Sequence, residues 1–108
     1  MEKCIVVTTL SDNLESIIKI QKELLENHLV SGCQISEVNS TYWWNNKINE
    51  SKEYKLEVRT LEKLFPDIEL VINQNHNYEL PEISYYEING NKEILEWINK
   101  YSNNIKAF

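Results

Sequence analysis

The chain has 108 residues, of which 42% are hydrophobic, and its 11 basic and 17 acidic residues give a net charge of −6. This length suits one domain with a hydrophobic core, and the two glycines and two prolines leave no linker, so we predict a single domain over residues 1–108. The acidic balance disfavours nucleic acid and membrane surfaces as partners, because both carry negative charge.

The cysteines and the N-terminal residues bear on the compartment. Cys4 and Cys33 form neither a CxxC pair nor a disulfide framework. The first residues carry no signal-peptide pattern, and no apolar run approaches the roughly 20 residues that a membrane-spanning helix needs. We therefore expect a cytoplasmic protein.

The first predicted elements are a strand and a helix. Residues 4–7 form a short, continuous apolar run rich in β-branched side chains, which is typical of a central strand covered on both faces. Asp12, with Glu15 three residues later, is a candidate helix cap. Apolar residues then recur at helical spacing as far as His28, which predicts an amphipathic helix.

Two strands joined by a tight turn are predicted next. In residues 33–44 the apolar positions change parity, and we interpret this change as a bulge near residues 36–37. Asn45 and Asn46 predict a hairpin turn, because Asn tolerates the left-handed backbone conformation. Residues 53–59 then alternate between apolar and charged side chains, as a half-buried strand does.

The remaining elements are two helices and a strand. Thr60 is a candidate cap for the second helix. Pro66 indicates either that this helix starts near Phe65 or that its first turn is kinked. Residues 83–88 predict a fourth strand, and a turn with Gly90 leads into the last helix. We expect the last helix to direct these residues inward: Ile94, Leu95, Trp97, Ile98 and Tyr101.

The predicted order, β-α-β-β-α-β followed by a C-terminal helix, is that of a ferredoxin-like split β-α-β sandwich, an α+β fold with helices on one face of an antiparallel sheet. The other face needs a cover, and a partner subunit is the simplest one. Tyr42, Trp43 and Trp44 place aromatic bulk on both faces of a small hairpin. We interpret this arm as an oligomer contact. The alternatives are a core packed under the last helix and a platform for ligand stacking.

Few residues suggest chemistry. The sequence has no glycine-rich phosphate loop and no hydrolase or metalloprotease motif, so we expect no enzyme. His76 suits the end of the second helix, with Asn77 closing that helix in a left-handed conformation. The same imidazole, with Cys33 and Glu79, is a candidate set of ligands for a weakly bound copper or zinc ion.

Arg59 stands where the third strand meets the second helix. An arginine at a strand end is a candidate anion contact, because its guanidinium group recognises carboxylates and phosphates. The alternative is a structural salt bridge between Arg59 and Glu82.

Several short motifs together carry a family resemblance. They run in order across nearly the whole chain: Val7-Thr8-Thr9, Cys33, the stretch 40–48 (Ser-Thr-Tyr-Trp-Trp-Asn-Asn-Lys-Ile), Glu53, Arg59-Thr60, the stretch 76–83 (His-Asn-Tyr-Glu-Leu-Pro-Glu-Ile) and the stretch 95–98 (Leu-Glu-Trp-Ile). In this order and spacing the chain resembles the CutA family of divalent-ion tolerance proteins.

The resemblance implies a tight homotrimer in which the hairpin arm reaches a neighbouring subunit and the sheets meet around a threefold axis. It also implies an association with tolerance to divalent metals, copper above all, and a likeness to the trimeric PII signalling proteins, whose clefts between subunits bind small ligands. The candidate cleft residues, apart from His76, are Tyr42, Trp44, Lys47, Glu53, Arg59, Tyr78 and Glu82.

The chain departs from the family pattern at the positions tied to copper. The copper-binding members carry a Cys in the first-strand motif and a His-His pair beside the helix end, and the matching positions here are Thr8, Asn75 and His76. Where the family has His-Pro-Tyr, this chain has His-Asn-Tyr at residues 76–78. It has Asn46 in place of the family's glycine in the hairpin, and Arg59-Thr60 in place of Lys-Thr. Weak metal binding is therefore the expectation.

Overall fold

The computed structural model describes residues 2–104, so Met1 and residues 105–108 of the predicted domain lie outside the described residues. The elements appear in the predicted order. They are β1 (Cys4–Ser11), α1 (Leu14–Glu26), β2 (Gly32–Trp44), β3 (Lys47–Leu61), the 3-10 turn η1 (Glu62–Leu64), α2 (Phe65–Asn75), β4 (Ser84–Glu87) and α3 (Lys92–Tyr101). None of the helices within residues 2–104 is long and apolar enough to span a membrane.

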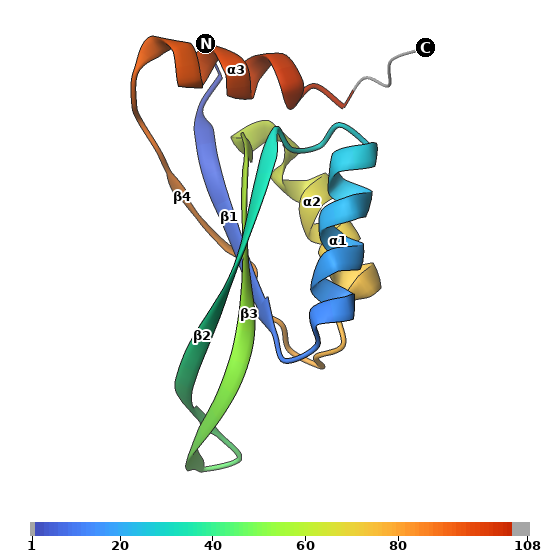
Figure 1. Cartoon of the computed structure of the whole chain (residues 1–108), viewed down its shortest axis with the longest axis vertical. Coiled ribbons are helices and arrows are strands. Elements are labelled where there is room, and N and C mark those ends of the chain that lie inside the picture. Colours follow the sequence, from blue (N-terminus) through green and yellow to red (C-terminus); the bar gives the residue numbers. More distant parts are fainter. Residues whose placement is uncertain (1, 105–108) are drawn as a thin grey trace.

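The sheet confirms the predicted α+β, ferredoxin-like architecture. Its strands lie in the order β2-β3-β1-β4, and every neighbouring pair is antiparallel. Figure 1 shows α1 and α2 on one face of the sheet and α3 across the end at which the chain starts. The outer halves of β2 and β3 extend beyond the rest of the molecule as a hairpin arm, which makes the longest dimension 45 Å.

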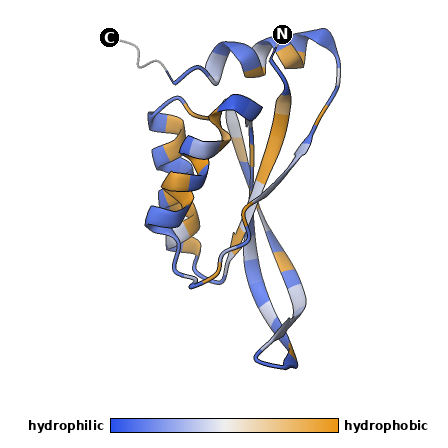
Figure 2. Cartoon of the chain, turned by 180° about the vertical axis from the view of Figure 1, so that it is seen from behind, coloured by the Kyte–Doolittle hydropathy of each residue, from blue (hydrophilic) through white to orange (hydrophobic). Residues whose placement is uncertain are grey.

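The core lies between the sheet and the two covering helices. Ile5 and Val7 on β1 point into it, as do Ile20 on α1 and Ile72 on α2, and each is at most 1% exposed. Successive strand residues face opposite sides, so Val6 lies on the sheet face away from this core, yet it is only 2% exposed. Figure 2 shows the hydrophobic residues gathered on β1 and on the inner sides of the helices, whereas the arm is mostly hydrophilic.

The predicted bulge in β2 is wrong. The pairing of β2 with β3 runs without interruption from Gly32 opposite Arg59 to Trp44 opposite Lys47. The apolar positions change parity because the outer half of β2 leaves the core, so no single face of it has to stay apolar. The turn prediction is confirmed: Asn45 and Asn46 have positive φ angles of 52° and 61°.

The start of α1 differs from the prediction, because Asn13 caps the helix in place of Asp12. The Asn13 side chain accepts a hydrogen bond from the Ser16 amide at 3.0 Å, which satisfies one of the free amides of the first turn. Asp12 is used elsewhere, in the loop contacts described below.

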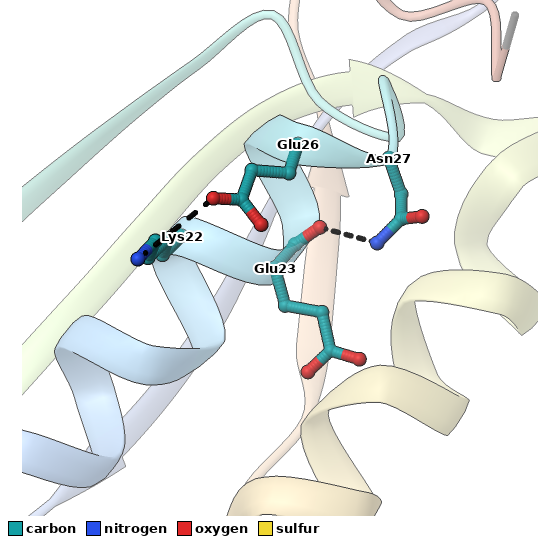
Figure 3. A network of polar contacts seen from close by, with 4 residues as sticks. All are labelled: Lys22, Glu23, Glu26 and Asn27. Carbon is teal, nitrogen blue, oxygen red and sulfur yellow. Dashed lines mark hydrogen bonds and ion pairs between the residues drawn. The ribbon is translucent and has the colours of Figure 1, made fainter. Parts of the chain in front are cut away.

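The other end of α1 is held by a polar network. The helix ends at Glu26, where the Asn27 side chain donates to the Glu23 carbonyl at 2.8 Å (Figure 3). The Glu23 carboxylate in turn accepts a hydrogen bond from Asn75 on α2 at 2.6 Å. The two covering helices are therefore tied together at this end, as well as by their apolar faces.

The start of α2 settles the two alternatives for Pro66. The helix begins at Phe65 with Pro66 in its first turn, where a missing amide donor costs nothing. Thr60 does not cap it, because β3 continues to Leu61 and the buried Thr60 hydroxyl donates to the Leu29 carbonyl at 2.6 Å.

The last strand and helix are smaller contributors to the core than predicted. The strand is Ser84–Glu87, shorter than the predicted 83–88. On α3 Ile98 is fully buried, but Trp97 and Tyr101 are 38% and 46% exposed, since the helix crosses the end of the sheet and packs through a narrow face. The predicted inward orientation is therefore confirmed for Ile98 and for Leu95, which packs against the core, and it is wrong for Ile94, Trp97 and Tyr101.

Candidate functional site

A pocket lies where the hairpin arm leaves the body of the molecule. It has a volume of about 630 Å³. Three segments form it: the arm, the turn between β1 and α1, and the loop between α2 and β4. The lining residues are Leu10, Asp12, Ser40, Thr41, Tyr42, Trp44, Glu53, Asn77, Tyr78, Glu79, Leu80 and Glu82.

His76 anchors the loop between α2 and β4 from behind the pocket. It ends α2 in an extended conformation, with φ −79° and ψ 144°. Its Nε2 lies 2.8 Å from the Leu10 carbonyl, and its Nδ1 accepts from the Tyr78 amide at 3.0 Å. These two contacts require the neutral ring protonated at Nε2. Burial lowers the pKa of His76, and the bond to Leu10 and the charges of Glu53 and Asp12 oppose this effect.

Asn77 and Tyr78 lock the same loop to the strands. The Ser11 hydroxyl donates to Asn77, whose side-chain amide donates to Asp12 Oδ1 at 2.8 Å. The Tyr78 hydroxyl accepts from the Asp12 amide at 2.9 Å and donates to Glu53 Oε2 at 2.6 Å. Asn77 is not among the described residues with positive φ, so the predicted left-handed closure is wrong: its side chain bonds to the β1–α1 turn while the backbone continues in the loop.

The Tyr78 hydroxyl remains protonated well above neutral pH. Burial, its hydrogen bond to Glu53 and the charges of Glu53 and Asp12 all raise the pKa of Tyr78, while its bond with the Asp12 amide acts in the opposite direction. Tyr78 therefore serves as a fixed donor to the Glu53 carboxylate and closes one wall of the pocket.

The pocket is acidic. Its lining contains four carboxylates, those of Asp12, Glu53, Glu79 and Glu82, and no lysine, arginine or histidine. Glu53 is only 6% exposed, although it sits on the outer part of β3. Glu82 also accepts a hydrogen bond from the Ser84 hydroxyl at 2.8 Å. The electrostatic environment therefore favours cations over anions.

The structure brings together most, but not all, of the predicted cleft residues. Those that line the pocket are Tyr42, Trp44, Glu53, Tyr78 and Glu82, and Glu79, predicted as a metal ligand, lines it as well. Lys47 lies opposite Trp44 at the tip of the arm and does not line it. Arg59 donates to the Gln34 side chain at 3.2 Å rather than forming the predicted salt bridge with Glu82. Arg59 pairs with Gly32 at the far end of the hairpin from the turn, which explains its separation from the pocket.

Cys33 is also remote from the pocket. It pairs with Val58, whereas Leu10, the partner of His76, lies opposite Lys55. Three residues along a strand correspond to about 10 Å, and Cys33 is in addition two strands away from β1. Burial raises the pKa of Cys33 to about 12, which keeps its thiol protonated.

The described residues assemble no ready metal centre. Within residues 2–104 no three His, Cys, Asp or Glu side chains are grouped so that they could hold a metal ion. Both ring nitrogens of His76 already have hydrogen-bond partners. The carboxylates of the pocket lie on different walls and do not meet at one point. Their oxygen atoms suit weak association with a hard cation better than tight binding of copper or zinc.

Two residues that the sequence assigned to helix ends complete the site. Asp12 was interpreted as a helix cap, and Asn77 as a helix-closing residue, yet both hold the loop to the β1–α1 turn. Antiparallel pairing of β1 with β4 brings the end of β1 and the loop before β4 to the same edge. The predicted ferredoxin-like fold therefore contained the signal that these two segments meet.

Together the fold and the pocket define a class: small ferredoxin-like proteins with a long hairpin arm and an acidic pocket at its base. Residues 4–101 match the family model described as CutA1 divalent ion tolerance protein. The chain belongs to this family.

Individual relatives and solved structures agree. A protein of Encephalitozoon cuniculi named "Probable divalent-cation tolerance protein cutA homolog" is 35% identical over 100 residues, which are 92% of this chain and 88% of that protein. The divalent-cation tolerance protein CutA of Thermococcus kodakarensis is 34% identical over 91% of this chain and 94% of its own. The structure of the periplasmic divalent cation tolerance protein CutA of Archaeoglobus fulgidus matches with a TM-score of 0.88 at 29% identity, covering 93% of this chain and 99% of that one.

Proposed function

We propose that this CutA family member acts in divalent-cation tolerance as a cytoplasmic homotrimer without enzymatic activity, and that it associates with divalent cations weakly, through the acidic pocket. The observation that carries the proposal is the lining of that pocket, which has four carboxylates and no basic side chain. The family membership and the names of the relatives support the link to divalent cations.

The exposed apolar side chains support the assembly. Trp43 and Ile48 face each other across the arm and are 70% and 62% exposed. Tyr86 on the edge strand β4 is 54% exposed. Aromatic surface of this extent, on an arm that projects from the body (Figure 1), is typical of a protein interface.

Light scattering tests the assembly. We expect a mass about three times the chain mass of 12.8 kDa at micromolar concentration. A monomer would contradict the proposal, and so would a dimer. Trp43→Ser, at the most exposed aromatic of the arm, should weaken the assembly, whereas Tyr101→Ser, on α3 and away from the arm, serves as the matched control.

Calorimetric titration tests the cation association. We expect weak binding of Mn²⁺, Cu²⁺ and Zn²⁺ that is reduced when Glu79 and Glu82 are both changed to Gln. His76→Ala should not abolish the binding, because both ring nitrogens of His76 are occupied by contacts that hold the loop and neither is free to bind a metal ion. Tight copper binding that disappears in His76→Ala would overturn the weak, oxygen-based site and restore His76 as a ligand.

A second candidate function is that of a small-ligand sensor like the PII proteins. The volume of the pocket, about 630 Å³, and the aromatic side chains of Tyr42 and Trp44 in its lining favour it, since typical small-molecule sites have volumes of roughly 300–1,000 Å³. A thermal-shift screen of nucleotides, inorganic anions and cations separates the two functions. Shifts produced by metal ions alone would argue against the sensor.

A further inference from the structure

Hydrogen bonds within the chain hold both walls of the pocket in place. The loop wall is held by hydrogen bonds from Asn77 to Asp12 and from Tyr78 to Glu53. On the arm wall, the Tyr42 hydroxyl lies 3.1 Å from the Ser51 hydroxyl across the hairpin. A site whose side chains are already positioned loses little conformational entropy when it binds.

Glu53 is a largely buried carboxyl group without a cationic side chain as its partner. It is 6% exposed, and its Oε2 accepts from the Tyr78 hydroxyl at 2.6 Å. Within residues 2–104 no side chain or amide donates to its Oε1, and the ion pairs found there involve other carboxylates. The side chain lines the pocket, so Oε1 is the oxygen that a cationic group in the pocket can reach, and such a group would compensate the largely buried carboxylate.

A single metal ion is a poor match for this site. No three acidic, histidine or cysteine side chains of the described residues converge on one point. Two walls instead carry separate carboxylates, Glu53 on the arm and Glu79 and Glu82 on the loop, around a volume of about 630 Å³. Carboxylates on two different walls match an extended molecule with more than one positive charge.

The aromatic side chains of the arm wall suit an organic stem. Tyr42 and Trp44 lie two residues apart on one strand, so their side chains share a face of the arm. Both line the pocket and are only 40% and 44% exposed. Aromatic faces attract ammonium groups and cover the methylene groups next to them. A hydrated metal ion has no apolar groups that could pack against these aromatic faces.

We propose that the pocket binds a linear organic polyamine, with one ammonium group at Glu53 Oε1, the alkyl stem along Tyr42 and Trp44, and a second ammonium group toward Glu79 and Glu82. This inference rests on the ligand-sensing function proposed above, and it is independent of metal binding. It also excludes nucleotides as ligands of this pocket, since their phosphates would meet four carboxylates and no basic side chain.

Calorimetric titration of the full chain with spermidine tests the proposal. We expect saturable binding with one site per chain, and affinity at least roughly tenfold weaker in Glu53→Gln, because a charge-assisted hydrogen bond is lost. Glu57→Gln is the matched control: it removes the same charge from the same strand, but Glu57 does not line the pocket. It should bind as the wild type does.

A second variant and a competing cation complete the experiment. Trp44→Leu, at a partly exposed position, should fold normally and weaken spermidine binding about fivefold through loss of the aromatic face. Mg²⁺ at matched ionic strength should not displace spermidine. Absence of saturable binding, or equal binding by Glu53→Gln and Glu57→Gln, would overturn the proposal. Light scattering and metal titration on the same samples report separately on the assembly and on the metal-based function.

Discussion

The Tyr78 hydroxyl joins three segments, and its removal should cost measurable stability. Tyr78→Phe deletes the donor to Glu53 Oε2 and the acceptor of the Asp12 amide. The Asp12 amide is exposed and can turn to water, whereas the Glu53 carboxylate is 6% exposed and loses its donor. Hydrogen bonds to charged groups contribute about 1.5–3 kcal/mol, so we expect a loss of about 2 kcal/mol per chain.

Guanidinium denaturation followed by tryptophan fluorescence measures this loss. Chain concentration must be equal for all variants, because assembly makes the apparent stability depend on it. Tyr86→Phe is the matched control: its hydroxyl lies 3.4 Å from Glu57 Oε2 and the residue is 54% exposed, so the change should be within about 0.5 kcal/mol. If Tyr78→Phe were no more destabilising than Tyr86→Phe, the role assigned to the Tyr78–Glu53 contact would be refuted.

The remaining predictions concern pH and the hairpin turn. Burial holds the pKa of His76 below its ordinary value of 6.5, so the unfolded chain binds more protons just below pH 6.5 and stability falls as the pH falls there. Denaturation between about pH 7.5 and about pH 5.5 should therefore show a shallower pH dependence in His76→Gln than in wild type. A wild-type slope in His76→Gln would be incompatible with this explanation. At the turn, Asn46→Ala should lower the unfolding free energy by about 1 kcal/mol, because alanine is strained at the φ of 61° found here. Asn46→Gly should be neutral or stabilising, because glycine adopts this conformation without strain. Equal unfolding free energies of the two variants would contradict a backbone cost at this position.

Much of the fold follows from local pattern. The apolar run at residues 4–7, the helical spacing before Glu26 and the Asn45-Asn46 turn all lie where local preference and tertiary contacts agree. The bulge was predicted wrongly, because parity indicates which face is buried only while the strand stays on the core, and the outer part of β2 does not. The helix cap was predicted at Asp12 and lies at Asn13. Both residue types suit that role, and the Asp12 side chain instead accepts a hydrogen bond from Asn77.

The site was only partly predictable. The family resemblance placed Tyr42, Trp44, Glu53 and Tyr78 in one cleft between subunits, and all four line the pocket of the single chain. The separation of Lys47, Arg59 and Cys33 from it depends on strand register, which fixes how far along the hairpin each residue lies. Sequence spacing does not contain that information. The burial of Glu53 depends in addition on a loop that folds back from α2, a contact between residues 25 positions apart.

The inner and outer parts of the long strand β3 differ in their stability against local opening. Its residues 54–59 pair with strands on both sides, whereas residues 47–53 pair with β2 alone. Amide hydrogens of the outer segment can exchange when the hairpin frays, without any opening of the core, while those of the inner segment require the central sheet to separate. The boundary falls at Glu53 and Tyr54. In an isolated subunit, a pocket at this boundary would open and close with the fraying arm, and anything that clamps the arm would change the lifetime of a bound molecule there.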